Sequence, residues 1–406
     1  MKFTVCSIII AIEVFANGCS AETEIQPLFE CTKNLENPYG IVSHISRSGS
    51  QYEYDMLDQA IHSLEDLGVN CVRTDLDCGG ITPVGAPTTV TRFDNLLSRT
   101  SNSGFNVCGI LTDLKYNLRC WDDYPSYWRY IDTLLSRYDK YLTAYEILNE
   151  ADRIPDDKLT EKYNNLLKQT YSRIKEKNPD AQVLYSGISW SKAGLFNLSM
   201  KDGAFDYFDI MNLHAYDIPE NLISHFDDIK KNMEKYGWSK HVWLTETGYS
   251  SCSESPVKDI FIATEEEQAF RLPKLFLIAF SCGVDKVFWY SHRSAELTAS
   301  EKEYFFGITH ADFCPKPAFK TYKTLIKMCP NGSSRPRMKI IDDYYFVRWE
   351  TPDNKYIAAL WLSENSKSTE HPDLSGKCFD MYGNKISHHD AKRKLSMKEV
   401  IYIVLK

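Results

Sequence analysis

The sequence lacks the signatures of several large protein classes. It has no glycine-rich phosphate loop after any apolar run, no CxxC pair, no internal repeat and no low-complexity linker. Its formal net charge is −8, which gives no basic footprint for nucleic acid or for an anionic membrane. No apolar stretch is long enough to cross a bilayer as a helix. These absences disfavour a nucleotide-binding open sheet, a nucleic-acid partner and a membrane-spanning protein.

The cysteines are numerous but irregularly spaced. There are 12 in the chain, and several, such as Cys71 and Cys108, lie inside apolar strand-like runs. A free thiol in such a run behaves as a small hydrophobic group. We therefore expect mostly buried free thiols, and neither a disulfide framework nor a metal site.

Residues 1–20 predict an export signal. A lysine precedes an apolar run, and small residues follow it. In "ANGCS" the small residues precede Cys19, as at a bacterial lipoprotein cleavage site. Two alternatives stay open here: ordinary secretion, or a lipid anchor on Cys19 that holds the protein at the cell surface or in the periplasm.

From about residue 36 to 330, short apolar runs alternate with amphipathic helical stretches. In one of these stretches Leu57, Ile61, Leu64 and Leu67 share a face, and Gly68 follows as a stop signal. The strand candidates are "GIVSHIS", "NCVRTDL", "NVCGILT", "AYEILNE", "QVLYSGI", "FDIMNLH", "HVWLTET" and "KVFWYSH". Eight strand–helix units predict an α/β fold, a (β/α)₈ TIM barrel over 36–330.

The pattern changes after residue 330. Strand-like runs such as "KYIAALWLSE" and "EVIYIVLK" follow one another with turn signals and, as we interpret them, without intervening helices. They predict a small all-β sandwich domain over 331–406 that packs against the barrel. We expect the segment before the first barrel strand to add an edge strand to it.

Two glutamates end predicted barrel strands. Glu150 ends the fourth strand, and Glu246 ends the seventh. Functional groups of such barrels lie at these strand ends, so both carboxylates can face one cleft. A lone glutamate at a strand end is commonly a helix N-terminal charge or a surface group, but this pair suits a retaining glycosidase. Its acid needs a pKa raised by burial and by an ionised neighbour, and its nucleophile needs to stay charged.

The motifs "EILNE" and "WLTETGY" resemble those of glycoside hydrolase clan A, and most of all family 39-like and family 5-like enzymes. The likeness covers the whole barrel, and the C-terminal tail resembles the β-sandwich of family 39-like bacterial proteins. It implies that Glu150 is the acid/base and Glu246 the nucleophile. It also implies that Asn149 hydrogen-bonds the sugar 2-hydroxyl.

Other strand-end residues are candidates for the sugar site. The resemblance implies that Arg73 holds the nucleophile, that His214 and Tyr216 orient it and line the site, and that Trp289 forms an aromatic floor. His44 is a further candidate contact to sugar hydroxyls. Three of these residues also have a structural interpretation: an ion pair for Arg73, a satisfied core hydrogen bond for His214 and plain core packing for Trp289. Glu146 shares the strand parity of Glu150, and we expect it in a buried structural network.

These observations predict an exported retaining β-glycoside hydrolase that acts by double displacement on a polysaccharide or oligosaccharide of the β-glucan or hemicellulose type. We expect a monomer with a carbohydrate substrate, without cofactor or metal. The high aromatic content of 13% suits sugar binding. Two alternatives remain: a non-catalytic glycan-binding lipoprotein, which would not need both glutamates, and a transglycosylase on the same site.

Overall fold

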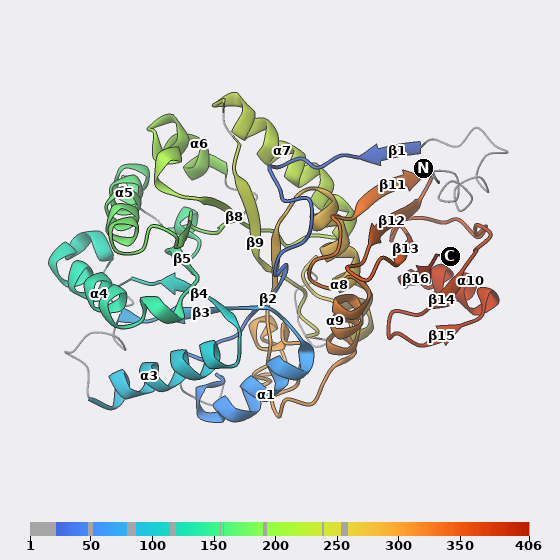
Figure 1. Ribbon diagram of the computed structural model, residues 1–406, viewed down its shortest axis with the longest axis horizontal. Coiled ribbons are helices and arrows are strands. Elements are labelled where there is room, and N and C mark those ends of the chain that lie inside the picture. Colours follow the sequence, from blue (N-terminus) through green and yellow to red (C-terminus); the bar gives the residue numbers. More distant parts are fainter. Residues whose placement is uncertain are drawn as a thin grey trace.

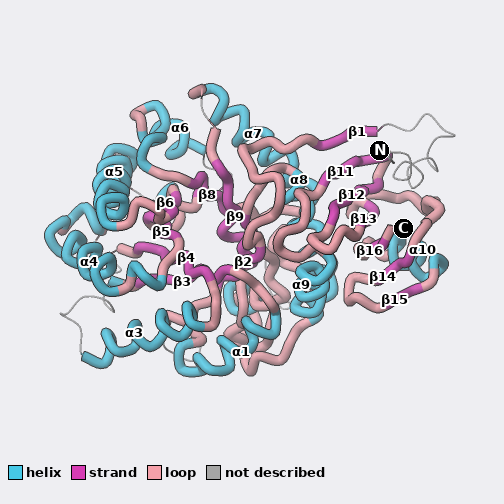
Figure 2. Tube along the Cα trace, viewed as in Figure 1, coloured by secondary structure: helices cyan, strands magenta, loops and turns pink. Residues whose placement is uncertain are grey.

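The computed structural model describes residues 22–47, 52–78, 87–113, 119–154, 156, 158–189, 193–237, 239–252 and 259–405 (Figures 1 and 2). The predicted export signal and Cys19 lie outside these residues. Within them, no helix is both long and apolar enough to cross a membrane.

A closed parallel barrel forms the larger part of the molecule. Its strands are β2 (Tyr39–Val42), β3 (Cys71–Leu76), β4 (Asn106–Leu111), β5 (Ala144–Ile147), β6 (Gln182–Leu184), β7 (Ile188–Ser189), β8 (Ile210–His214), β9 (His241–Thr247) and β10 (Lys286–Trp289). The short β6 and β7 share one position, so the ring has eight, and a pairing of β6 with β8 closes it. All eight predicted strands are confirmed, and with them the TIM-barrel fold.

The barrel axis is filled by one apolar side chain from each of the eight strand positions. These residues form a cluster of their own, separate from the core under the helices: Val42, Cys71, Cys108, Ala144, Leu184, Ile210, Trp243 and Phe288. The ten described cysteines are free, and eight of them are buried, as expected of thiols in apolar strands. The barrel interior is therefore a packed core, and polar groups are left to its open end.

Helices surround the strands (Figure 1). They are α1 (Leu57–Leu67), α3 (Pro87–Asn102), α4 (Tyr124–Arg137), α5 (Leu159–Lys177), α6 (Ala193–Lys201), α7 (Leu222–Lys235), α8 (Glu265–Ser281) and α9 (Pro317–Met328). The predicted face of α1 is buried, and the helix ends at Gly68, whose φ of 83° suits a residue without Cβ. α8 is buried on almost all sides because the C-terminal sheet covers the face that would otherwise meet solvent.

The C-terminal part is a seven-stranded antiparallel sheet in the order β1-β11-β12-β13-β16-β14-β15. Its strands are β1 (Glu22–Ile25), β11 (Arg337–Ile341), β12 (Tyr344–Glu350), β13 (Tyr356–Leu362), β14 (Lys377–Phe379), β15 (Lys385–Ile386) and β16 (Ile401–Val404). β1 pairs with β11, so the predicted N-terminal edge strand is confirmed. One face of the sheet shares a continuous core with α8 and α9 of the barrel.

The expectation of strands without an intervening helix is wrong. α10 (His388–Ser396) lies between β15 and β16, where Ser387 caps its N-terminus by accepting a hydrogen bond from the Asp390 N–H. Ala391 and Leu395 of this helix pack on the second face of the sheet, in a small core of their own. Both faces of the sheet are therefore covered, one by α8 and α9 and the other by α10.

Candidate active site

Glu150 lies just beyond β5, where the chain leaves the strand in a strained turn. Leu148 and Glu150 have φ of 62° and 45°, in the left-handed region that costs a non-glycine residue about 1 kcal/mol or more. Asn149 between them pairs with Gly187 through an isolated bridge, and a 3₁₀ turn over Ala151–Arg153 follows at once. Strain of this kind persists only where the surroundings hold it in place.

Arg73 on β3 holds these groups together, and it is almost fully buried. Its Nε and Nη2 donate to the two oxygens of Glu146, at 2.7 and 2.9 Å. Nη2 also donates to Asn149 Oδ1 at 2.7 Å, and Nη1 donates to Glu246 Oε2 at 3.1 Å. Burial would lower the pKa of Arg73, but Glu146 outweighs it and raises the pKa above its ordinary value. The fully buried Glu146 is thus a member of a structural network, as predicted.

Glu246 on β9 receives a second donor from β8. The Tyr216 hydroxyl donates to Glu246 Oε1. The Tyr216 ring is held edge-on by Phe261 and Phe306, with centroids at 5.4 and 5.9 Å. Burial, followed by the Glu246 charge, raises the pKa of Tyr216 well above 10, so this hydroxyl stays a donor. The Glu246 carboxylate is therefore fixed by two donors on different strands.

His214 at the end of β8 lies between the two carboxylates. Its Nδ1 is 3.3 Å from Glu150 Oε1 and 3.8 Å from Glu246 Oε2. One oxygen of each glutamate and one ring nitrogen of His214 all lie within 4.8 Å of one another. Gly187 makes room for the ring, because a Cβ there would lie 2.0 Å from His214 Nε2. The structure thus brings Glu150, Glu246 and His214 into one cluster.

The hydrogen bonds around His214 indicate where its protons lie. The Thr245 hydroxyl donates to Asn212 Oδ1 at 2.6 Å, so Thr245 Oγ1 accepts from His214 Nε2 at 3.2 Å. Both hydrogens of Arg73 Nη2 are already directed at Glu146 and Asn149. Nδ1 of His214 therefore faces Glu150 Oε1, at 3.3 Å.

Arg153 acts on Glu150 from the solvent side. Its Nη1 lies 2.9 Å from Glu150 Oε2, and its side chain is 58% exposed, whereas that of Glu150 is 15% exposed. Burial would raise the pKa of Glu150, but His214 and then the two arginines, Arg153 and Arg73, outweigh it and lower the pKa. The expected rise in the pKa of the acid is not found in this structure, because His214 and then Arg153 lie against the Glu150 carboxylate.

His44, beyond β2, belongs to a second polar group. Its Nδ1 lies 3.2 Å from Asp75 Oδ2, and Arg47 donates to Asp75 Oδ1 at 2.7 Å. Although burial opposes them, His44 and Arg47 lower the pKa of Asp75 well below its ordinary value. The His44 ring also makes T-shaped contacts with the rings of Tyr52 and Tyr290, and the ring centroids are 5.9 Å apart in each pair.

Trp289 is not brought to this site. It is fully buried in the core beneath the helices, where it packs against Tyr249 at 6.0 Å. The inward-facing side chains of this strand are its neighbours, Phe288 on the barrel axis and the partly exposed Tyr290. The rings of Tyr290 and Tyr216 both pack against Phe306, with centroids at 5.3 and 5.9 Å, and Tyr216 donates to Glu246. The aromatic residue of β10 that faces the site is Tyr290, and strand parity was the signal that could have identified it.

The cluster of Glu150, His214 and Glu246 has the donor types of a metal site. Each carboxylate already accepts from an arginine, Arg153 on Glu150 and Arg73 on Glu246. Two guanidinium groups beside the cluster oppose a further cation. The residues therefore fit a hydrogen-bond network better than a metal centre.

Comparisons with known proteins agree with this geometry. The family model described as cellulase (glycosyl hydrolase family 5) matches residues 35–271, more than half of the chain. No curated protein matches in sequence.

Solved structures share the fold. A family 39 glycoside hydrolase from Bacteroides cellulosilyticus WH2 aligns with a TM-score of 0.69 at 17% identity, over 93% of this chain and 82% of that one. A glucosidase from Croceicoccus marinus aligns with a TM-score of 0.59 at 14% identity, over 87% of this chain and 79% of that one. A family 39 enzyme from Xanthomonas axonopodis pv. citri aligns with a TM-score of 0.58 at 13% identity, over 86% of this chain and 78% of that one.

Proposed function

The chain belongs to glycosyl hydrolase family 5, a clan A family of glycosidases, and on that premise we propose that it is a retaining β-glycosidase that uses Glu246 and Glu150. The observation that carries the proposal is the distance between the two carboxylates. One carboxylate oxygen of Glu150 and one of Glu246 lie within 4.8 Å of each other. Retaining enzymes hold their carboxyl groups about 5–5.5 Å apart, whereas inverting enzymes need about 6.5–9.5 Å to admit a water.

In the first step Glu246 attacks the anomeric carbon of a bound β-glycoside. The bond from that carbon to the leaving-group oxygen breaks, and Glu150 gives its proton to this oxygen. Arg73 and Tyr216 keep the attacking carboxylate oriented, because each donates to a different oxygen of Glu246. Asn149 is held by Arg73 through its Oδ1, which leaves its exposed amide N–H₂ free to meet the sugar 2-hydroxyl.

In the second step water attacks the anomeric carbon of the glycosyl-enzyme, and Glu150 accepts the water's proton while Glu246 leaves. Glu150 must therefore carry a proton in the first step and release it before the second. His214 Nδ1 lies 3.3 Å from Glu150 Oε1, close enough for a proton to pass between the two groups. A sugar that fills the cleft also removes water from Glu150, and this desolvation favours its neutral form.

The sugar-binding wall is formed by groups from four strand ends. Tyr290 follows β10, Tyr216 follows β8, and His44 with Asp75 lies at the ends of β2 and β3. Flat rings beside fixed polar groups suit a substrate with apolar faces and hydroxyl edges. We propose a β-linked oligosaccharide or polysaccharide of the β-glucan or hemicellulose type, and an exported protein, either secreted or anchored through Cys19.

Proton NMR of the first product tests the proposal. Aryl β-glycosides and β-glucan, xylan, mannan and galactan oligosaccharides would be incubated with the protein, and the anomeric signal followed before mutarotation. We expect the β-anomer to form first from at least one of them. Initial formation of the α-anomer would contradict retention, and a panel without any turnover would contradict the glycosidase assignment on these sugars.

A further inference from the structure

The C-terminal sheet contributes a charged side chain to the helix behind the nucleophile candidate. Glu364, two residues beyond β13, accepts from Arg271 of α8 in a bidentate pair, with Nε to Oε1 at 3.0 Å and Nη2 to Oε2 at 2.9 Å. Both side chains are 12% exposed. A bidentate pair with so little solvent is well fixed in orientation. α8 and α9 lie between the barrel strands and this sheet (Figure 1).

A second cation shares the same carboxylate. Lys274, one turn further along α8, is fully buried, with its Nζ 3.9 Å from Glu364 and 4.0 Å from Glu220. In the described part of the chain its Nζ has no hydrogen-bond partner. Glu220 lies in the loop after β8, the strand whose end also carries Tyr216. Removal of the Glu364 charge would thus leave two buried cations of α8 with less compensation.

Arg271 connects this pair to the loop that follows Glu246. Its guanidinium lies over the ring of Tyr249, 4.9 Å from the centroid. Tyr249 is fully buried, three residues after Glu246, and its hydroxyl donates to the backbone oxygen of Asp217. Asp217 directly follows Tyr216, whose hydroxyl donates to Glu246. The contacts therefore run without a gap from the C-terminal sheet to the carboxylate.

α8 also contacts the loop after Glu246 at a second point. Gln268, also buried, donates through Nε2 to the backbone oxygen of Tyr249 at 2.8 Å and to that of Phe306 at 3.3 Å. Phe306 is one of the two rings that hold Tyr216. The loop that follows Glu246, and Phe306 beside Tyr216, thus both depend on the placement of α8.

We propose that Glu364 is a positioning residue for Glu246, so that the C-terminal sheet is part of the catalytic unit. Through Arg271 and Tyr249, Glu364 fixes the loop after β8, which carries Tyr216, and the loop after β9, which directly follows Glu246. This inference rests on the proposed role of Glu246 and goes beyond it, because Glu364 touches neither the reacting atoms nor the sugar site.

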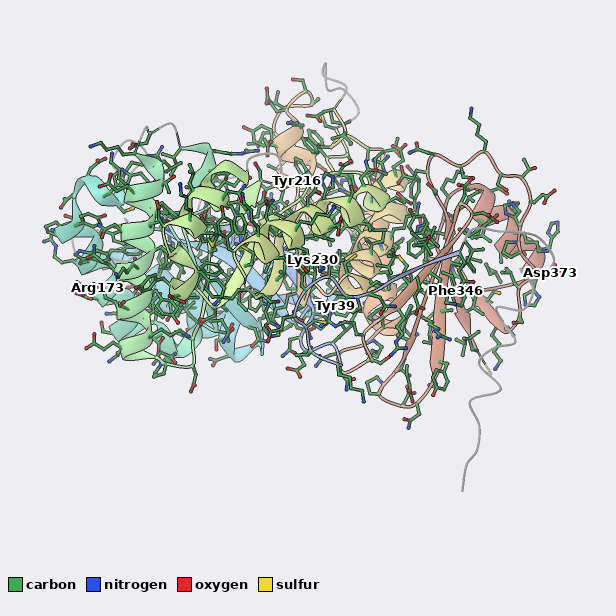
Figure 3. All side chains as sticks on the ribbon, turned by 90° about the horizontal axis from the view of Figure 1, so that it is seen from above. Tyr39, Arg173, Tyr216, Lys230, Phe346 and Asp373 are labelled. Atoms are coloured by element: carbon green, nitrogen blue, oxygen red, sulfur yellow. The ribbon has the colours of Figure 1, made fainter. Side chains whose placement is uncertain are left out.

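The test uses the full chain with Glu364→Gln, which keeps the shape of the side chain and removes its charge. The control is Asp373→Asn, which breaks the exposed pair between Asp373, in the segment before β14, and Lys392 of α10, far from Tyr216 (Figure 3). Activity would be measured on 2,4-dinitrophenyl β-glycosides of glucose, mannose, xylose and galactose. Their leaving group needs no acid, so the first step on these substrates does not depend on proton transfer from Glu150.

We expect Glu364→Gln to lower kcat about 10- to 100-fold with KM within about twofold, since small misplacement of a reacting group has this effect. Asp373→Asn should keep the wild-type kcat. Tyr249→Phe, which removes one hydroxyl from the same path, should lower kcat in the same way and decides the matter if Glu364→Gln does not fold.

Wild-type kcat in both Glu364→Gln and Tyr249→Phe would overturn the inference alone, even with a lowered Tm, because a purely structural role moves stability and not kcat. A wild-type protein that cleaves none of the four glycosides would contradict the proposed function, and this inference with it.

Discussion

Gly187→Ala offers a way to disturb the site without removing any polar group from it. An added Cβ would lie 2.0 Å from His214 Nε2 and 2.5 Å from Cδ2, whereas ordinary contacts begin near 3.4 Å. The imidazole would therefore have to move by about 1.4 Å, the difference between those two distances. Such a movement breaks the bond to Thr245 and displaces Nδ1 from Glu150.

The size of the effect follows from this displacement. A misplacement of about 1 Å in a catalytic site costs on the order of 100-fold in rate, or about 2.7 kcal/mol of transition-state stabilisation. Overpacking of a buried site costs about 1–3 kcal/mol of stability in addition. We therefore expect kcat/KM for an aryl β-glycoside to fall about 100-fold, while the variant still folds.

The matched control is Gly194→Ala in α6. A Cβ at Gly194 meets no atom within 4 Å, so this change should leave activity unaltered and stabilise the helix by up to about 1 kcal/mol. Steady-state kinetics and a thermal melt of both variants suffice. Wild-type kcat/KM in Gly187→Ala would refute the reasoning, because it would show that the position of His214 does not matter to the reaction.

Three further perturbations separate the roles of the charged groups. Glu150→Gln should slow glycosides with poor leaving groups far more than dinitrophenyl glycosides, which kinetics on a leaving-group series will show; equal loss on both would argue against an acid. Arg153→Gln should raise the pKa of Glu150, because Arg153 lowers it in the structure, and should move the alkaline limb of the kcat/KM profile to higher pH. A limb that stays in place or moves to lower pH would disprove that coupling. Arg73→Met should lower the free energy of unfolding by about 3–5 kcal/mol, because it leaves the buried Glu146 uncompensated, and a change under 1 kcal/mol in a denaturant titration would contradict this.

The barrel could be predicted because each of its strands is a separate local signal. An apolar run, a turn and an amphipathic helix recur eight times, and the strand ends identify the functional edge. Glu150, Glu246, Arg73, His214 and Tyr216 lie together in the structure for this reason. The helix α10 was missed because only Ala391 and Leu395 of its nine residues are buried, too few for an apolar face to be recognised.

For Trp289, the residue type predicts the wrong location of the side chain, whereas its position in the strand alternation predicts the right one. A tryptophan at a strand end invites a role in sugar binding, but its neighbours Phe288 and Tyr290 face the barrel interior. Successive side chains of a strand alternate between faces, so Trp289 must face the helices. Counting from Phe288 would have selected Tyr290.

Contacts between segments that are far apart in the chain could not be predicted from the sequence. The pair of Glu364 with Arg271 joins residues 93 apart, on different parts of the fold. Arg153 is near Glu150 in the chain, but only the left-handed turn at Glu150 brings their side chains together. Neither arrangement leaves a local pattern, because both depend on how finished elements pack.

The most direct measurement of the central claim is azide rescue of Glu246→Ala. If Glu246 is the nucleophile, this variant should lose turnover of a dinitrophenyl β-glycoside, and added azide should restore part of it by attacking the anomeric carbon from the vacated side. The product predicted is the α-glycosyl azide, identified by NMR. Full activity of Glu246→Ala, or rescue that yields only the β-glycosyl azide, would contradict the assignment.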